Sequence, residues 1–258
     1  MSQIRSWEAT RPAFLSVPPG GVLVATDYDG TIAPIVSDPE QALPLPALIV
    51  HLSALVPLVR GVAVISGRSE TSLRRLLPVP GVIRIGENGI GTLSSDERSL
   101  LRDFELRAGA VVDRWAGVVI ESKPASVSIH YRSRPEVALE LKSALSGLIA
   151  GSGLTLVANR MVFDVQLRRS GKIRTMCGLL RDLKPAAVLY AGDSRDDSRV
   201  HRCLQGAAIP RLCVGLASDD LPGGIFKQAD LILDGPYGME ELFSRLVQLW
   251  SPSPSERD

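Results

Sequence analysis

Two aspartates at the end of an apolar segment are the first candidates for chemistry in this 258-residue chain. Residues 22–26 are apolar and rich in β-branched side chains, as expected of a buried parallel strand, and Asp27 and Asp29 follow directly, before Gly30. Open α/β sheets bind ligands outside the carboxyl ends of their strands. Two carboxylates there can act as nucleophile, general acid/base and Mg2+ ligand. A strand followed by an ordinary Asp-Gly turn explains the same residues, so this segment alone leaves both interpretations open.

A second acidic group follows a later apolar segment. Asp193, Asp196 and Asp197 come just after residues 187–191, and packing does not readily explain three carboxylates within five residues. Asp193 would complete a set of hard oxygen ligands for Mg2+, and Asp197 could bind the ion directly or through water. The alternative is a polar turn in which an aspartate caps the next helix.

Two further segments contain groups suited to phosphate. Ser66, Gly67 and Arg68 follow the apolar residues 61–65. A hydroxyl beside backbone N–H groups at a strand-to-helix turn can cradle a phosphate, whereas a serine N-cap with a solvent-facing arginine is the alternative. Lys172 begins a predicted helix and could neutralise a phosphoryl oxygen as a point charge, although a lone lysine is more often a surface residue.

The elements that must position these residues alternate in type. The order of strands and helices predicts an α/β fold with a doubly wound parallel sheet and right-handed crossovers. The predicted strands are 22–26, 61–65, 82–85, 187–191, 211–214 and 231–233, and the predicted helices are 45–59, 69–77, 171–183 and 238–249.

The middle of the chain has a different, αββαββ pattern, which indicates an inserted α+β cap domain of antiparallel type. We expect a core of residues 1–100 and 168–258 and a cap of residues 101–167 that lies over the crevice of the sheet. Residues 1–20 are predicted to be a loosely held leader, and 251–258 have a disordered composition. In the cap, helices are predicted at 104–116 and 135–149, and strands at 118–123, 126–131, 154–157 and 161–165, with a turn at 158–160.

Composition excludes several classes of function. The net charge of +1 and the lack of a basic run give no reason to expect a nucleic-acid partner, and no apolar stretch approaches the roughly 20 residues of a membrane span. The N-terminus lacks a secretory apolar region, and Cys177, Cys203 and Cys213 lack CxxC spacing, as expected of thiols in a reducing compartment. A cytoplasmic protein, monomeric or weakly oligomeric and without a membrane partner, is therefore predicted. No GxGxxG follows the first strand, which argues against a dinucleotide-binding dehydrogenase.

Taken in order, the four segments resemble the motifs of the haloacid dehalogenase (HAD) superfamily of phosphotransferases. Asp27-Tyr28-Asp29-Gly30-Thr31 matches its first motif, Ser66 its second, Lys172 its third and Gly192-Asp193-Ser194-Arg195-Asp196-Asp197 its fourth. A closer resemblance, to trehalose-6-phosphate phosphatases, extends over about residues 22–247. It rests on residues 27–36, 38–39, 65–68, 86–89, 121–123 and 128–132.

The resemblance implies a HAD-like core and a Mg2+-dependent reaction. It implies that Asp27 attacks phosphorus to form an aspartyl-phosphate. Asp29, protonated when the ester binds, would then serve as general acid and later as general base. Mg2+ would be held by Asp27, the backbone carbonyl of Asp29 and Asp193, with Asp197 as a further metal residue.

The same resemblance implies how the substrate is bound. Ser66, Gly67 and Lys172 would bind the phosphoryl oxygens. The cap would select the sugar, and its candidate substrate-binding residues are Glu121, Lys123, His130, Arg132 and Asp164. For His130 and Arg132, a solvent-facing position on a strand is an equal alternative.

Two departures from the family pattern bear on the substrate. The usual Glu-x-Arg-Pro of the last cap strand is Asp164-Val165-Gln166-Leu167 here, and the usual GDDxTDE is GDSRDD. The leading interpretation is a phosphatase for the small-molecule sugar phosphate trehalose 6-phosphate. The alternatives are another sugar phosphate, a trehalose-like pseudo-disaccharide phosphate, a phosphomutase, or a catalytically silent sensor, against which the intact acidic set argues.

Overall fold

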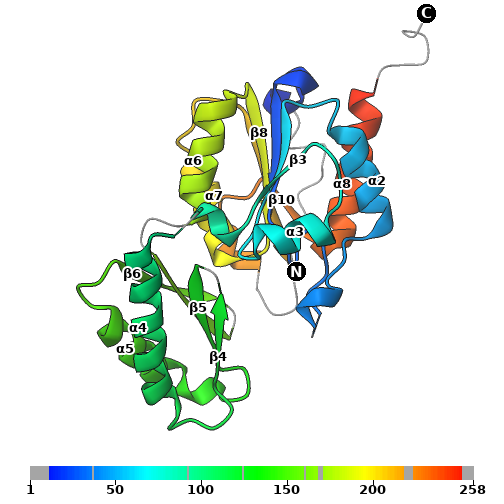
Figure 1. Ribbon diagram of the computed structural model, residues 1–258. Helices are drawn as coiled ribbons and strands as arrows, with labels where there is room; N and C mark the ends of the chain where they lie inside the picture. The colour runs from blue at the N-terminus through cyan, green and yellow to red at the C-terminus, as the bar shows by residue number, and fades with distance from the viewer. Residues whose placement is uncertain are drawn as a thin grey trace, which may run out of the picture.

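A six-stranded parallel sheet, in the order β10-β9-β8-β1-β2-β3, forms the larger unit of the molecule (Figure 1). The central strand β1 is buried along its whole length between β2 and β8, which explains its apolar sequence. The prediction of a doubly wound α/β core is therefore confirmed. The strands are β1 (Val22–Thr26), β2 (Gly61–Ile65), β3 (Val82–Ile85), β8 (Ala187–Gly192), β9 (Arg211–Ala217) and β10 (Leu231–Asp234).

Helices cover both faces of this sheet (Figure 1). One face packs against α2 (Pro46–Leu55), α3 (Glu70–Leu76) and α8 (Gly235–Trp250), and the other against α6 (Lys172–Leu183) and α7 (Arg195–Leu204). Shorter helical turns are α1 (Pro12–Leu15), η2 (Pro19–Gly21), η3 (Pro39–Gln41), η4 (Glu87–Gly89) and η6 (Gly223–Ile225).

The computed structural model describes residues 12–36, 38–91, 93–123, 125–159, 161–167, 171–217 and 223–251. The first eleven residues of the expected leader, and the tail from residue 252, lie outside that part of the chain. The rest of the leader is not loosely held, because Phe14 on α1 is buried and its ring lies 6.1 Å from that of Trp250 on α8.

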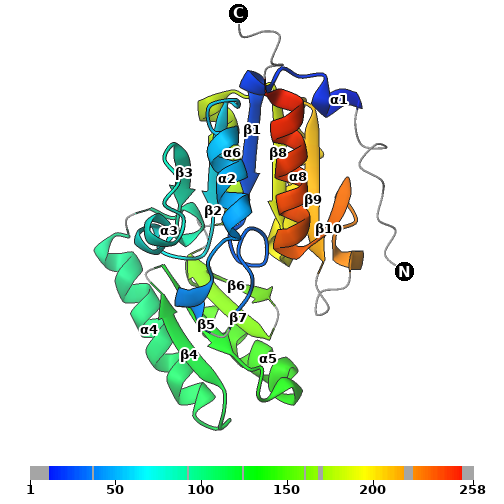
Figure 2. The same cartoon turned by 90° about the vertical axis from the view of Figure 1, so that its right-hand side faces the viewer.

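The smaller unit is built on a four-stranded antiparallel sheet in the order β4-β5-β7-β6, and its αββαββ order confirms the predicted cap topology (Figure 2). Apolar side chains on one face of this sheet pack against the two helices in a hydrophobic core of their own. The elements are α4 (Ser95–Val112), β4 (Val119–Lys123), β5 (Ser126–His130), η5 (Pro135–Val137), α5 (Ala138–Ile149), β6 (Leu154–Asn159) and β7 (Val162–Leu167).

Two local predictions in this unit are corrected. The predicted helix 104–116 begins instead at Ser95 and ends at Val112, so its first turns precede the expected cap boundary at residue 101. Ser94 and Glu97 form a capping box at this start of the helix. Because the first turns of the helix are polar, the spacing of apolar residues did not reveal where it begins. The predicted strands 154–157 and 161–165 form a hairpin, but β6 extends to Asn159, so residues 158 and 159, expected in the turn, belong to the strand.

The second face of the cap sheet carries polar side chains and is directed toward the core. Paired residues on adjacent antiparallel strands share a face, which places Glu121, Ser128 and Asp164 side by side. A pocket lies between this face and the core. It is lined by Lys123, Ser126, Val157, Asp164 and Gln166 of the cap and by Gly67, Asn88 and Asp196 of the core.

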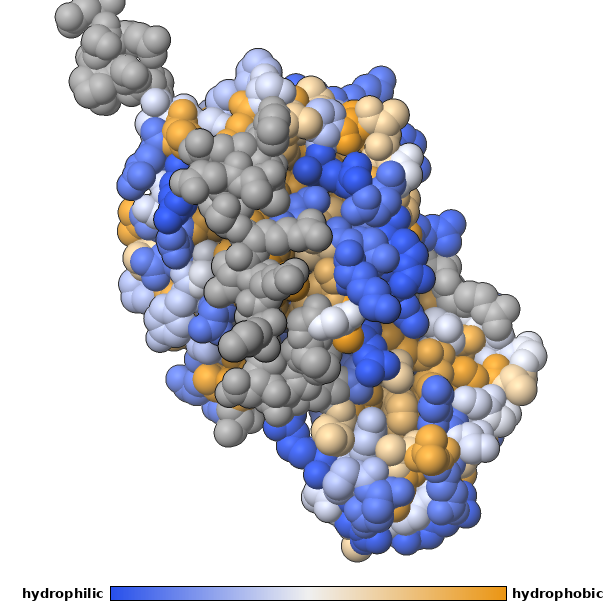
Figure 3. Space-filling model, turned by 180° about the vertical axis from the view of Figure 1, so that it is seen from behind, coloured by the Kyte–Doolittle hydropathy of each residue, from blue (hydrophilic) through white to orange (hydrophobic). Residues whose placement is uncertain are grey.

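The face opposite to that of Figure 1 mixes hydrophilic and hydrophobic side chains. Seen from behind, hydrophilic and hydrophobic residues are interspersed over both units (Figure 3). Within the described residues, the helices are all too short or too polar to cross a membrane.

Candidate active site

Asp27 stands at the point where the central strand of the core ends. Its backbone N–H donates to the carbonyl oxygen of Ala191 at 2.9 Å, which extends the β1–β8 pairing by one residue. Its Oδ1 accepts a hydrogen bond from the backbone N–H of Tyr28 at 2.7 Å. The side chain is thus fixed at the carboxyl edge of the sheet, as predicted for a nucleophile.

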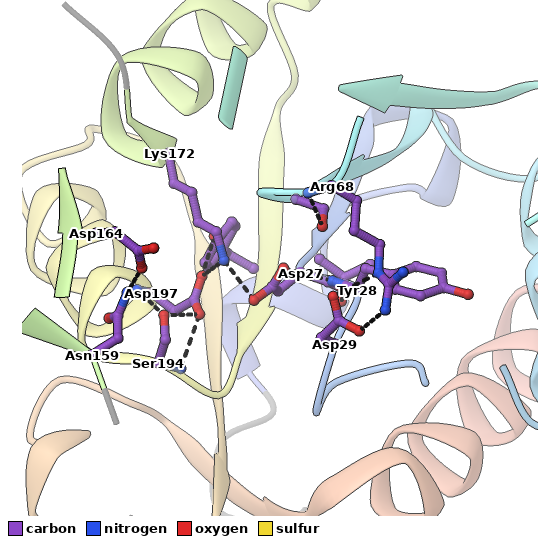
Figure 4. Close-up of polar contacts among 12 residues, drawn as sticks. Asp27, Tyr28, Asp29, Arg68, Asn159, Asp164, Lys172, Ser194 and Asp197 are labelled. Carbon is purple, nitrogen blue, oxygen red and sulfur yellow. Dashed lines mark hydrogen bonds and ion pairs between the residues drawn. The ribbon is translucent and has the colours of Figure 1, made fainter. Parts of the chain in front are cut away.

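Lys172 joins the two acidic segments. Its Nζ lies 2.5 Å from Oδ2 of Asp27 and 2.8 Å from Oδ1 of Asp197 (Figure 4). The lysine side chain is only 6% exposed, which excludes the surface position considered as its alternative. As the first residue of α6, Lys172 reaches the site from the helix that follows the cap.

Asp197 is held by four hydrogen bonds. Its Oδ1 accepts from Lys172 Nζ and, at 2.7 Å, from the hydroxyl of Tyr190. Its Oδ2 accepts from the backbone N–H of Ser194 at 3.0 Å and from Oγ of Ser194 at 2.5 Å. The two carboxylate oxygens are therefore both engaged, in a capping box at the start of α7. Asp197 thus both caps a helix and contributes to the site.

The charges in this cluster are strongly coupled. Burial acts to lower the pKa of Lys172, but Asp197 and Asp27 outweigh burial and raise it, so the ammonium group is charged. Burial acts to raise the pKa of Asp197, but Lys172, Ser194 and Tyr190 together lower it. The pKa of Asp27 is raised, chiefly by burial and against the effect of Lys172, so its anionic form depends on nearby positive charge.

Asp193 completes an acidic cluster that fits a hard divalent cation. One carboxylate oxygen from each of Asp27, Asp193 and Asp197 lies within 4.8 Å of the others. Burial, and then Asp197, raise the pKa of Asp193 to about 7, against the effect of Lys172. Three carboxylates with a single ammonium group between them are typical of sites that bind Mg2+.

Asp29 does not join that cluster in the structure. Its two oxygens accept from Arg68 Nε at 2.8 Å and Nη2 at 2.7 Å, and Figure 4 shows the carboxylate turned toward the guanidinium group. The guanidinium group also lies over the ring of Tyr28, 5.2 Å from its centroid. The sequence alone leaves open whether Arg68 faces solvent, and the structure brings it into the site.

This pairing bears on the protonation expected of Asp29. A guanidinium group that donates two hydrogen bonds is a partner for a carboxylate, not for a carboxylic acid. The Asp29 side chain is also 39% exposed. In the structure, both oxygens of Asp29 therefore act as hydrogen-bond acceptors.

Ser66 and Gly67 lie at the end of β2, beside the cluster. Ser66 is 1% exposed, and its Oγ accepts from the backbone N–H of Arg68 at 3.1 Å. Ser66 is not the N-cap of α3, because that role belongs to Ser69. Gly67 lines the pocket between the two units.

The polar face of the cap contributes a second network. Asp164 accepts from Nδ2 of Asn159 at 2.7 Å and from the hydroxyl of Ser128, and Lys123 Nζ lies 4.0 Å from its Oδ1. Glu121 lies 2.9 Å from His130 Nε2 and 3.5 Å from Lys123 Nζ. The hydrogen bond from His130, followed by the charge of Lys123, lowers the pKa of Glu121 although burial opposes them.

The structure brings four of the five predicted cap residues together. Glu121, Lys123, His130 and Asp164 form one network, whereas Arg132 is exposed beyond the end of β5 and is not among the residues that line the pocket. Asn159 was not among the predicted residues, although the register of the hairpin places it diagonally opposite Asp164. Tyr190 was not predicted either, although its buried hydroxyl requires a partner.

A profile of the trehalose-phosphatase family matches residues 25–212, which include the strand ends, Lys172 and the whole cap. The chain belongs to this family. Among curated relatives, the bifunctional trehalose-6-phosphate synthase/phosphatase of Thermoproteus tenax is 31% identical over 68% of this chain and 26% of its own length. The trehalose-phosphate phosphatase of Mycobacterium avium is 26% identical over 86% of this chain and 61% of its own length.

Solved structures show the same fold. The C-terminal domain of the Candida albicans trehalose-6-phosphate phosphatase superposes with a TM-score of 0.71 at 19% identity, covering 89% of this chain and 93% of the other. The Synechocystis sucrose-phosphatase has a TM-score of 0.56 at 18% identity, with coverage of 89% and 98%. The chain spans 26% to 61% of the length of the first three curated relatives, so trehalose-phosphatase family membership does not by itself establish their activities here.

Proposed function

We propose that this protein is a phosphoric monoester hydrolase that cleaves trehalose 6-phosphate to trehalose and phosphate. The observation that carries the proposal is the Asp27–Lys172–Asp197 arrangement at the carboxyl edge of the parallel sheet, opposite a polar cap face. A buried nucleophile beside a fixed ammonium group suits phosphoryl transfer. Hydrogen-bonding groups on the cap suit the hydroxyls of a sugar.

In the first step, Oδ of Asp27 attacks phosphorus and the bond from phosphorus to the sugar oxygen breaks. Lys172, with the Ser66 hydroxyl and the backbone N–H groups near Gly67, stabilises the charge on the phosphoryl oxygens. Asp29 donates a proton to the leaving sugar oxygen. Because Arg68 engages both oxygens of Asp29, at least one of these contacts must open when Asp29 acts as an acid.

In the second step, water attacks phosphorus of the aspartyl-phosphate, and the bond from phosphorus to Asp27 breaks. Asp29 accepts the proton of that water, and Arg68 stabilises the anionic form in which Asp29 begins this step. Asp29 thus returns to the protonated state required for the next substrate.

The acidic cluster fits Mg2+ as the cofactor. Asp27 and Asp193 are the side chains that would hold it, together with the backbone carbonyl of Asp29. Mg2+, when bound, supplies positive charge that offsets repulsion between the Asp27 carboxylate and the phosphate. Asp197 accepts four hydrogen bonds, which favours a positioning role through Lys172 over direct coordination.

The proposal is tested by phosphate release in the presence of Mg2+. The panel comprises trehalose 6-phosphate, sucrose 6-phosphate, glucose 6-phosphate and a pseudo-disaccharide phosphate. We expect the highest kcat/KM for trehalose 6-phosphate, with Asp27→Asn folded but inactive. A strong preference for another substrate would reassign the cap specificity. Folded, Mg2+-binding protein inactive on all of them would contradict the enzyme assignment.

A cap variant separates sugar recognition from chemistry. Asp164→Ala removes the acceptor held by Asn159 and Ser128, and we expect the KM for the disaccharide phosphate to rise about tenfold, the effect of one lost hydrogen bond to a charged group. Hydrolysis of the small ester p-nitrophenyl phosphate should stay unchanged. Met161→Ala, at the exposed turn of the same hairpin, is the matched control.

A further inference from the structure

Two of the three cysteines lie next to each other on the surface, away from the acidic cluster. Cys177 is on α6 and Cys203 is on α7, and both are exposed. Their Sγ atoms are 3.9 Å apart. The third cysteine, Cys213, is buried in the middle of β9.

This spacing is close to that of a covalent pair. A disulfide has an S–S distance of about 2.05 Å, so the sulfur atoms must approach by about 2 Å, a movement within reach of side-chain rotation. The two helices already pack against the same face of the core sheet. The residues are far enough apart in sequence that only the folded chain brings them together.

Both thiols are open to solvent, so a small oxidant can reach them. Burial and the neighbouring Cys177 raise the pKa of Cys203, which makes Cys203 the poorer first nucleophile. We therefore assign the first oxidation to Cys177.

We propose that Cys177 and Cys203 form a reversible, hydroperoxide-sensitive dithiol that closes to an intramolecular disulfide between α6 and α7. The Cys177 thiolate attacks the terminal oxygen of the hydroperoxide, the O–O bond breaks, and water or an alcohol leaves with a proton. The Cys203 thiolate then attacks the resulting sulfenic sulfur, the S–O bond breaks, and a second water leaves. Two thiols are oxidised by two electrons, and the hydroperoxide is reduced.

The disulfide would reinforce the helix pair that positions the catalytic lysine. The ion pair from Lys172 to Asp197 links the starts of α6 and α7. A second, covalent link further along the same helices would restrict their separation in both the folded and the unfolded chain. A cross-link of this kind stabilises chiefly by reducing the entropy of the unfolded state.

In the test, the reduced protein is treated with hydrogen peroxide. Reduced glutathione in the same tube serves as the control thiol. We expect the loss of two thiols per chain, a decrease in mass by two hydrogen atoms, and one cross-linked peptide containing Cys177 and Cys203. The Tm should rise by roughly 5–10 °C, and a dithiol reductant should reverse it. Cys213 should remain a thiol.

Single variants identify the pair. Cys177→Ser and Cys203→Ser are exposed, conservative changes, and each should abolish the cross-linked peptide and the rise in Tm. Cys213→Ala should leave both intact. Cys177 and Cys203 both remaining thiols after the glutathione is consumed, oxidation of either to sulfinic acid without a cross-link, or a disulfide only between chains would each overturn the proposal. The wild-type peptide map decides the outcome even if one variant fails to fold.

Discussion

Lys172 is the residue through which both acidic segments of the site are held. Its ammonium group pairs with Asp27 on one side and with Asp197 on the other, and Tyr190 fixes Asp197 in turn. A buried charge of this kind needs both partners, because the loss of one leaves the other uncompensated. The carboxylate of Asp197 therefore controls the position of the Lys172 ammonium group.

Asp197→Asn tests this relation at nearly constant volume. We expect Lys172 to shift toward Asp27, and a displacement of about 1 Å lowers kcat/KM by roughly 100-fold. The free energy of unfolding should fall by about 3 kcal/mol, because a buried ion pair is broken. Asp182→Asn, an exposed change on α6, is the control for steady-state kinetics and urea unfolding. Near wild-type kcat/KM in Asp197→Asn would refute the positioning role.

Asp193 makes metal binding depend on pH near neutrality. Burial and Asp197 raise its pKa from 3.8 to about 7 in the metal-free protein, so below pH 7 Mg2+ must displace a proton. We expect the Mg2+ affinity, measured by calorimetry, to fall as the pH drops below 7. The slope of this decrease should approach about tenfold per pH unit. Binding should release a proton at pH 6 and almost none at pH 8. Proton release that does not change with pH would contradict this assignment.

The raised pKa of Asp193 also changes the free energy of unfolding with pH, in the opposite direction from the lowered pKa of a salt-bridged aspartate. Between about pH 4 and 7 the folded protein retains a proton on Asp193 that the unfolded chain releases. In EDTA, this group's contribution to the free energy of unfolding should therefore decrease as the pH rises through that window. Asp193→Asn should remove this component of the pH dependence.

The turn after β1 is the element that gives the acidic cluster its space. Gly30 has a φ of +70°, and a Cβ atom there would overlap the carboxylate of Asp193. Gly91 has nearly the same φ, +69°, but a Cβ atom there would have open space around it among the described residues. A comparison of variants at these two glycines therefore separates the effect of backbone strain from the effect of steric overlap with Asp193.

Gly30→Ala and Gly91→Ala should each lower the free energy of unfolding by about 1–2 kcal/mol, because alanine is strained at positive φ. Only Gly30→Ala should also reduce Mg2+ affinity and kcat/KM, the latter by about 100-fold. Urea unfolding, calorimetry and phosphate release measure the three effects. Equal catalytic losses in both variants would show that strain alone is responsible.

The periodicity of apolar residues was enough to predict the elements, and the strand ends together with the family resemblance pointed to the residues that meet at the edge of the sheet. Buried runs such as 22–26 and 187–191 are distinctive, and Asp27, Lys172 and Asp193 stand where those elements begin or end. The start of α4 was missed because its first turns are polar. The Arg68 contact to Asp29 was left open because it joins two loops, which only the assembled sheet brings together.

At the scale of the whole molecule, the first and last described helices are packed against each other. Phe14 on α1 is 2% exposed and lies against Trp250 at the end of α8. Phe14→Ala should lower the free energy of unfolding by about 3 kcal/mol or more, the usual cost of a large aromatic removed from a core. Ser16→Ala, on the exposed side, is the matched control, and equal urea midpoints for the two would contradict the packing role.

The central position of β1 has a consequence for synthesis. One edge of β1 has its partner β2 available as soon as residue 65 has emerged from the ribosome, whereas its other edge must wait for β8, which emerges only after the whole cap. Among the residues that the structure describes, the hydrophobic cluster of the cap extends from Ile90 to Leu167 and takes no member from outside that interval. We expect the cap to complete its fold on the nascent chain while half of the core sheet is still open, because its contacts are local. The pairing of Asp27 with Lys172 would then be among the last contacts to form.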